Sequence, residues 1–254
     1  MTFERLEPGT PEWIAYIANH EQRYAFAARQ LAALGPNARV LDAATGVGYG
    51  ASQLSAAIGC TVVGIDRDSH AIDVARARYG NGRVEFLQDD CDTLQAAEAR
   101  WPVYDAVVSF ETIEHLRDPL PFLRRVRSLL APSGLFVAST PNRGDAALDR
   151  PQWDYHEREY AAGEFRALLD AAGFNDVALF GQQLTAIGEL RRDLRSEINT
   201  LRFNPLARVG FWIQRTLRGV QLPPALPERP DDLEIVPIDG ARPFVLIATA
   251  RRPA

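Results

Sequence analysis

The sequence predicts an α/β fold in which a doubly wound, mostly parallel sheet is covered by helices on both faces. Strand patterns and helix patterns alternate from residue 39 to residue 139, which is typical of such sheets. A glycine-rich loop, VLDAATGVGYG at residues 40–50, follows the first expected strand. The second expected strand ends in Asp66, about 20 residues farther on, where ligand-binding acids lie in folds of this kind.

The expected elements follow from the spacing of apolar residues. Residues 11–34 have helical periodicity, and Gly35-Pro36 ends that helix. The next strands are short apolar or β-branched runs, expected at 39–43, 61–65, 84–87, 105–110 and 135–139. The helices between them are expected at 50–58, 69–79 and 119–130.

Beyond Pro141 the regular alternation stops. Residues 142–160 read as a long polar loop, and loops of that length in compact domains are often functional. A helix is expected at 163–172, a strand at 174–180, a mostly helical stretch at 184–220, a proline-rich link at 222–230 and a last strand at 244–250. We therefore expect an N-terminal helical cap (1–36) and one domain (37–254) that carries the loop 142–160 and a helical insertion at 182–242.

Composition excludes several classes of function. All 28 Lys and Arg residues are arginine, which rules out a Walker-type phosphate loop and Schiff-base lysine chemistry. The net charge of −5 gives no reason to expect a nucleic-acid partner. Two cysteines make no disulfide framework. No signal peptide and no apolar run of ~18 residues is visible, so we expect a cytoplasmic protein without a transmembrane segment.

Asp42 separates two interpretations of the glycine-rich loop. Residues 46–51 satisfy the dinucleotide pattern G-x-G-x-x-G/A, yet a carboxylate ahead of the loop disfavours a pyrophosphate. S-adenosylmethionine carries no phosphate, and its sulfonium and ammonium groups suit a nearby carboxylate. Alternatively, Asp42 bonds its own loop. We expect Asp66 to accept the ribose hydroxyls, and its alternative role is to cap the helix at Ser69.

Five ordered motifs resemble those of the class I S-adenosylmethionine-dependent methyltransferases. Residues 42–48 align with their first motif, with Ala44 in place of its first glycine. Segments 64–79, 84–94, 104–116 and 129–142 match later motifs, and 104–116 is similar to ubiquinone-biosynthesis O-methyltransferases. The resemblance implies a seven-stranded Rossmann-like sheet with an antiparallel last strand. It places at the cofactor Asp42, Ala44, Thr45, Gly46, Gly48, Asp66, Arg67, Asp90, Cys91 and Ser109, with Asp90 and Cys91 at the adenine.

Transfer to a hydroxyl requires that the acceptor lose a proton, so a general base is expected. The candidates are His156, in the polar segment WDYHEREY (153–160), and His115 and Glu111, just past the fourth strand. His115 has an alternative structural role at the start of the next helix. The neighbouring acids suggest a divalent metal that positions two sugar hydroxyls, but no carboxylate spacing is specific, and no metal ligands are assigned.

Two further segments resemble parts of bacterial methyltransferases of glycan biosynthesis. The stretch NHEQRYAFA (19–27) is similar to their lead-in, which would place Arg23 and Tyr24 over the cofactor, with Arg23 on its carboxylate. The alternative is a capping helix with an exposed arginine. Residues 202–220 are an amphipathic, arginine-rich segment. Packing against the sheet is the simplest role for it. A lid over the acceptor, a homodimer contact and a peripheral membrane contact are others.

The function expected from the sequence is methyl transfer from S-adenosylmethionine to a hydroxyl of a sugar or glycan intermediate. An O-methyltransferase acting on a phenol or quinone and an N-methyltransferase acting on an amino sugar remain alternatives. An NAD-dependent dehydrogenase is disfavoured by Asp42 and by the lack of a second catalytic domain. A regulatory protein that binds the cofactor without turnover is the remaining alternative.

Overall fold

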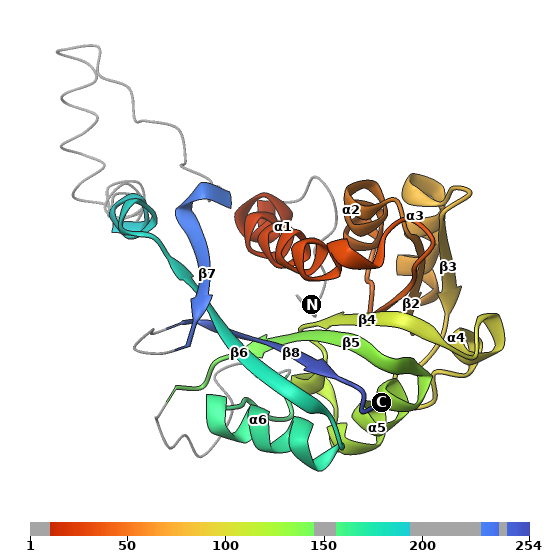
Figure 1. Ribbon diagram of the computed structural model, residues 1–254. Coiled ribbons are helices and arrows are strands. Elements are labelled where there is room, and N and C mark those ends of the chain that lie inside the picture. Colours follow the sequence, from red (N-terminus) through yellow and green to blue (C-terminus); the bar gives the residue numbers. More distant parts are fainter. Residues whose placement is uncertain (1–10, 145–155, 194–229, 239–242) are drawn as a thin grey trace, which may run out of the picture.

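The computed structural model describes residues 11–144, 156–193, 230–238 and 243–254 (Figure 1). Its strands are β1 (Arg39–Ala43), β2 (Thr61–Asp66), β3 (Val84–Gln88), β4 (Tyr104–Phe110), β5 (Leu130–Pro141), β6 (Asn175–Leu184), β7 (Leu233–Pro237) and β8 (Val245–Arg251). Its main helices are α1 (Pro11–Leu31), α2 (Tyr49–Ile58), α3 (Ser69–Tyr79), α4 (Gln95–Arg100), α5 (Pro119–Leu129) and α6 (Ala162–Ala171). Short 3₁₀ turns are η1 (Ala32–Leu34), η2 (Ile113–His115) and η3 (Pro230–Asp232).

The strands form one sheet in the order β3-β2-β1-β4-β5-β8-β6-β7. The pairs from β3 to β5 are all parallel, and β8 lies antiparallel between β5 and β6. The chain winds outward from β1 to β3 and returns to β4 on the other side of β1. The carboxyl ends of β1 and β4 therefore flank the point where ligands bind in doubly wound sheets.

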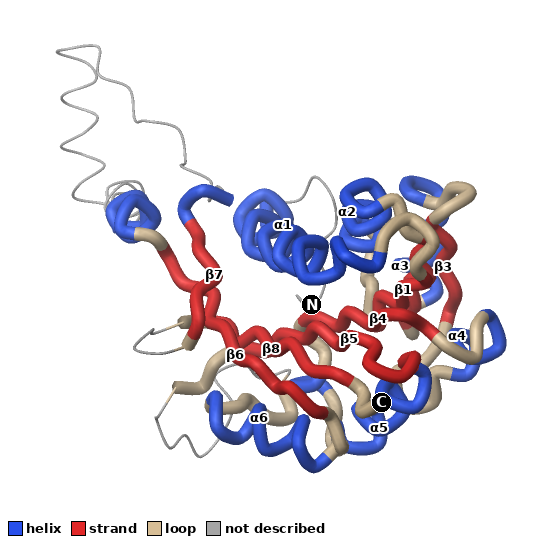
Figure 2. The backbone as a smooth tube through the Cα atoms, in the orientation of Figure 1, coloured by secondary structure: helices blue, strands red, loops and turns tan. Residues whose placement is uncertain are grey.

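Helices cover both faces of the sheet (Figures 1 and 2). Helices α1, α2 and α3 pack on one face, with Leu31, Leu54 and Ile72 in the buried cluster there. Helices α4, α5 and α6 pack on the other face, where Phe122 and Phe165 are fully buried. Because every central strand faces a helix layer on each side, the strands are apolar at nearly every position rather than at alternate ones.

The predicted fold class and the antiparallel last strand are confirmed, but the sheet has eight strands and not seven. The additional strand is β7, which lies inside the segment 182–242 that was predicted to be helical, and β6 runs into the same segment as far as Leu184. Strand β7 pairs antiparallel with the end of β6. Residues 186–193 are helical as predicted, whereas the amphipathic segment 202–220 and most of the proline-rich link lie outside the described residues.

The expected polar loop at 142–160 is described only at its two ends. Asn142 and Tyr160 form a parallel bridge, and the N–H of Arg143 donates to the carbonyl of Tyr160 at 3.0 Å. The N–H groups of Glu157 and Arg158 both donate to the carbonyl of Glu114. These bonds hold residues 156–160 against the carboxyl ends of β4 and β5.

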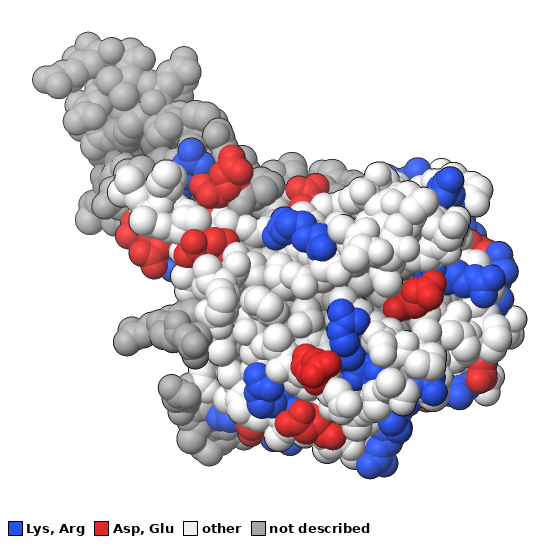
Figure 3. Space-filling model, viewed as in Figure 1, with Lys and Arg blue, Asp and Glu red and all other residues white. Residues whose placement is uncertain are grey.

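The charged side chains are mixed in sign on the face shown in Figure 3. Arginines and acidic residues alternate there, without the basic stripe that typifies nucleic-acid binding. Among the described residues, the helices are all too short or too polar to cross a bilayer.

Candidate active site

The loop after β1 is shaped by two glycines with left-handed backbone conformations. Gly46 has φ = 57° and Gly48 has φ = 86°. A Cβ on Gly48 would lie 2.6 Å from the Phe86 ring, so this position also requires close packing. A Cβ on Gly46 would meet nothing within 4 Å. The loop is therefore packed tightly on its inner side, and it leaves open space beside Gly46 for a ligand to approach its backbone.

Ala44 stands where the family motif has its first glycine, and its φ is 62°. A left-handed conformation at a residue with a Cβ costs about 1–2 kcal/mol relative to glycine. The backbone path of the motif is thus retained in spite of the substitution, with local strain at Ala44.

Asp42 is fully buried beneath this loop. Its carboxylate accepts hydrogen bonds from Thr45 Oγ1 at 2.6 Å and from the Tyr24 hydroxyl at 3.1 and 3.2 Å. Burial raises the pKa of Asp42 to about 7, although both hydrogen bonds oppose that rise. The side chain of Asp42 therefore bonds its own loop, as the alternative interpretation expected, and with a pKa of about 7 it can be neutral or ionised near neutral pH.

Asp66 connects the end of β2 to the glycine loop. Its Oδ2 accepts from the N–H of Gly46 at 3.0 Å, and its Oδ1 accepts from the N–H of Asp68 at 2.9 Å. The suggestion that Asp66 caps the next helix is wrong, because the N-cap of α3 is Asp68, whose side chain accepts from the N–H groups of His70 and Ala71. Asp66 is thus fixed at the loop, and a carboxylate has lone pairs left for two hydroxyls.

The other expected cofactor residues lie at neighbouring strand ends. Asp90 is exposed after β3. Cys91 is partly buried there, and burial followed by the charge of Asp66 raises the pKa of its thiol. Arg67 is exposed next to Asp66. Ser109 is buried in β4, and its hydroxyl donates to Thr112 Oγ1 at 2.9 Å.

Arg23 and Tyr24 are both buried, at 2% and 4% exposure. The Tyr24 ring packs on Gly50, where a Cβ would lie only 1.9 Å from it, and it meets Phe110 edge to face. Arg23 Nη1 donates to Gln182 Oε1 at 2.9 Å, and its Nε is buried without a hydrogen-bond partner. The alternative interpretation, a capping helix with an exposed arginine, is therefore wrong. Arg23 is buried and links α1 to β6 through Gln182.

Glu111 lies immediately after β4. Its backbone is left-handed, with φ = 52°, and its N–H donates to the carbonyl of Ser139 at 3.1 Å. The Ser139 hydroxyl donates to Glu111 Oε1 at 2.7 Å. The half-buried carboxylate is thereby turned toward the end of β5 beside the switch point.

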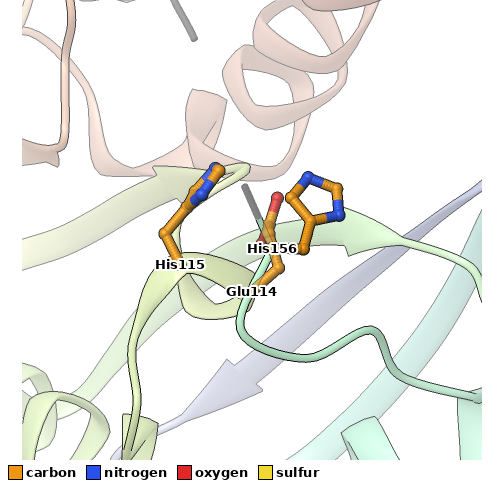
Figure 4. Close-up of side chains that lie close together, drawn as sticks. All are labelled: Glu114, His115 and His156. Atoms are coloured by element: carbon orange, nitrogen blue, oxygen red, sulfur yellow. The ribbon is translucent and has the colours of Figure 1, made fainter. Parts of the chain in front are cut away.

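Glu114, His115 and His156 gather next to Glu111, with the Glu114 carboxylate between the two imidazole rings (Figure 4). The ring centres of His115 and His156 are 5.1 Å apart. His156 Nδ1 lies 2.8 Å from Glu159 Oε1, and the two side chains are only 5% and 1% exposed. The structure therefore brings together two of the residues predicted to be catalytic, His115 and His156, from segments about 40 residues apart, and Glu111 lies three residues before Glu114 in the sequence.

Glu114 and Glu159 were among the acids noted beside His115 and His156 in the sequence, but neither was assigned a role. Glu114 is fully buried, and Thr140 Oγ1 donates to its Oε2 at 3.0 Å. Burial, with the charge of Glu111 next, raises the pKa of Glu114 well above its usual range. The available signal was the spacing of three between Glu111 and Glu114 and between His156 and Glu159, which is too common to single them out.

Known proteins that are similar to this chain are methyltransferases. Residues 17–179 match the model of a family described as a methyltransferase domain. A probable S-adenosylmethionine-dependent methyltransferase of Mycobacterium tuberculosis is 41% identical over 144 residues, which cover 56% of this chain and 50% of that protein. A ubiquinone biosynthesis O-methyltransferase of Cereibacter sphaeroides is 38% identical over 107 residues, covering 41% and 42%.

The fold has solved counterparts as well. Phosphoethanolamine N-methyltransferase 2 of Haemonchus contortus, solved with S-adenosyl-L-methionine, aligns with a TM-score of 0.60 at 19% identity, over 92% of this chain and 52% of that one. That likeness concerns the fold. The chain spans about half the length of the first Mycobacterium relative.

Proposed function

The chain belongs to the methyltransferase domain family, and we propose that it transfers the methyl group of S-adenosylmethionine to a hydroxyl of a sugar or glycan intermediate. The observation that carries the proposal is the buried cluster of carboxylates and imidazoles at the carboxyl ends of β4 and β5, on the same edge of the sheet as the glycine loop that follows β1. A hydroxyl entering there meets groups that accept hydrogen bonds and protons. An alkyl or aromatic surface would instead be expected for an apolar acceptor.

The residues around the loop fit S-adenosylmethionine. Gly46 leaves open space beside its backbone, and Asp66 is fixed at the strand end where a ribose would lie. Asp42 supplies latent negative charge for a cationic ligand. Arg23 has a buried Nε without a hydrogen-bond partner, which suits a carboxylate. When bound, the cofactor supplies an electrophilic methyl group on a positively charged sulfur.

The chain itself must then align the acceptor and remove its proton. Alignment of two bound reactants contributes a large part of the barrier reduction in such transfers. Glu111, His115 and His156 are the proposed groups that hold the hydroxyl and take its proton, and Glu159 orients His156 through the contact at Nδ1. Residues 156–160 are held at this position by the carbonyl of Glu114.

A phenol or quinone acceptor is the second candidate. The similarity to a ubiquinone biosynthesis O-methyltransferase over 107 residues favours it. The same proton-accepting cluster would serve a phenol, whose hydroxyl is more acidic than that of a sugar. With either acceptor, we propose that the partner is a small molecule or a saccharide. We also propose a cytoplasmic location.

The test is transfer of a radiolabelled methyl group from S-adenosylmethionine to a panel of sugars, sugar nucleotides and phenols. We expect label in one class of sugar hydroxyl, with none in a reaction that lacks the chain. Label only in phenols would favour the second candidate. Tight cofactor binding without transfer to any acceptor would contradict both and favour a regulatory protein.

A further inference from the structure

Three ligand-bearing side chains converge next to Glu111. One donor atom each from Glu114, His115 and His156 lies within 4.8 Å of the other two. Metal–ligand bonds of about 2.0–2.2 Å place neighbouring ligand atoms roughly 3–4 Å apart around an ion. Small side-chain rotations would therefore bring the three atoms to one ion. Figure 4 shows the two rings on either side of the carboxylate.

The surroundings of these side chains are those of a metal site. A metal-binding histidine usually contacts a carboxylate through its other ring nitrogen, and His156 Nδ1 contacts Glu159 at 2.8 Å. Thr140 holds one oxygen of Glu114.

The second oxygen of Glu114, Oε1, points to a missing partner. It is buried and has no hydrogen-bond partner in the structure, and the side chain is fully buried. A buried polar atom normally has a partner, and a carboxylate in this position is stabilised by a cation.

We propose that Glu114, His115 and His156 bind a divalent transition-metal ion, with Glu159 positioning His156. Two imidazoles and one carboxylate favour Zn²⁺, Mn²⁺, Fe²⁺ or Co²⁺ over Mg²⁺ and Ca²⁺, which prefer oxygen ligands throughout. Three protein ligands leave positions open on the ion, which is the arrangement of catalytic rather than structural metal sites.

The role of the ion rests on the proposed function. The open positions would bind the acceptor hydroxyl and lower its pKa. His115 and His156 would then act as ligands, and Glu111 would be the group that takes the hydroxyl proton. The ion thus divides the roles among the three predicted catalytic residues.

The experiment measures metal binding to the chelator-treated chain in the absence of cofactor and acceptor. Co²⁺ is titrated while its visible absorption is recorded, and Zn²⁺ is titrated by calorimetry with Mg²⁺ as a comparison. We expect one Co²⁺ or Zn²⁺ per chain and much weaker Mg²⁺ binding. His156→Ala and Glu114→Gln should abolish the site, and Glu159→Gln should weaken affinity about 10–100-fold. His70→Ala, which removes an exposed histidine on α3, should bind as the parent does.

No binding, or binding that His156→Ala, Glu114→Gln and Glu159→Gln all leave unchanged, would overturn the proposal. Circular dichroism and cofactor binding of each variant show whether it is folded, and Glu159→Gln tests the site if a ligand variant is not. Because no methyl transfer is measured, metal binding and the proposed activity succeed or fail separately.

Discussion

The two halves of the candidate site are built in different ways. The cofactor half lies at the ends of β1 to β3 and is formed mainly by the backbone of one continuous loop. Asp66 holds this loop by accepting a hydrogen bond from the N–H of Gly46. In the acceptor half, at the ends of β4 and β5, side chains from residues 111–115 and 156–159 meet only in the folded chain. The first half therefore depends on local sequence, and the second depends on the arrangement of distant segments.

The comparison predicts that acceptor-half variants change turnover and that cofactor-half variants change cofactor affinity. The largest effect is expected for Glu111→Gln, which removes the proposed proton acceptor while keeping a partner for the Ser139 hydroxyl. We expect kcat to fall about 100-fold or more and the cofactor Kd to stay unchanged. Glu157→Gln, at an exposed acid of the adjoining segment, is the matched control. A large change in cofactor Kd for Glu111→Gln would contradict the separation of the site into a cofactor half and an acceptor half.

The next effect is expected for Asp66→Ala. Loss of charge-assisted hydrogen bonds to the ribose, each worth about 1.5–3 kcal/mol, should weaken cofactor binding about 100-fold by calorimetry. Asp68→Ala is the control, since it removes the N-cap of α3 and lowers stability by about 1 kcal/mol without touching the ribose position. Equal affinities for Asp66→Ala and the parent would refute the ribose assignment.

A smaller effect is expected from pH through Asp42. With a pKa of about 7 in the free protein, Asp42 is mostly neutral at pH 6 and mostly ionised at pH 8. A cationic ligand favours the ionised form, so cofactor affinity should rise as pH rises through 7, by up to about tenfold, and then level off. Calorimetry across this range measures the rise, and Asp42→Asn should flatten it.

The same group has the opposite effect on the stability of the free chain. Its carboxyl holds a proton up to about pH 7 when folded but only to its ordinary value of 3.8 when unfolded. The contribution of Asp42 to the free energy of unfolding is therefore full below pH 3.8 and is lost as pH rises to 7. If the cofactor affinity of Asp42→Asn rises with pH as much as the affinity of the parent chain does, Asp42 is excluded as the cause of that rise.

The smallest effect is expected for Ala44→Gly, which restores the glycine of the family motif. Relief of the left-handed strain at Ala44, partly offset by the greater freedom of unfolded glycine, should raise the free energy of unfolding by roughly 0.5–1 kcal/mol. Ala57→Gly on the exposed side of α2 should lower it by about 1 kcal/mol. If a denaturant titration shows that the free energy of unfolding rises for Ala44→Gly and falls for Ala57→Gly, the strain at Ala44 is supported. Equal losses in the two variants would exclude it.

Most of the fold was predictable because strands buried on both faces and amphipathic helices leave strong periodic patterns. Strand β7 was not predictable. Its five residues, LEIVP, follow a stretch rich in prolines and acids, and the strand is evident only from its pairing with the end of β6 in the structure. Helix α4 has six residues, too few for a clear period.

The candidate site divides in the same way. Asp42, Gly46 and Gly48 were predicted from the first motif and Asp66 from the end of the second strand, and in the structure Asp66 bonds the loop through the N–H of Gly46. Glu114 is buried and accepts a hydrogen bond from Thr140 of β5, a contact between separate segments that no local pattern reveals. The predicted roles of the site residues remain proposals.

The pairing of β6 with β7 has a consequence for how this chain can vary. Leu184 and Leu233 are partners in register, and the N–H of Thr185 donates to the carbonyl of Asp232 at 2.9 Å. The chain therefore leaves the sheet after Leu184 and rejoins it at Leu233, at paired positions of β6 and β7. Lengthening a flexible loop whose two ends lie together costs little free energy, about 0.6 kcal/mol for each doubling of the loop length. A change in the length of the chain between Leu184 and Leu233 can therefore be accommodated without a shift in the register of β6 and β7.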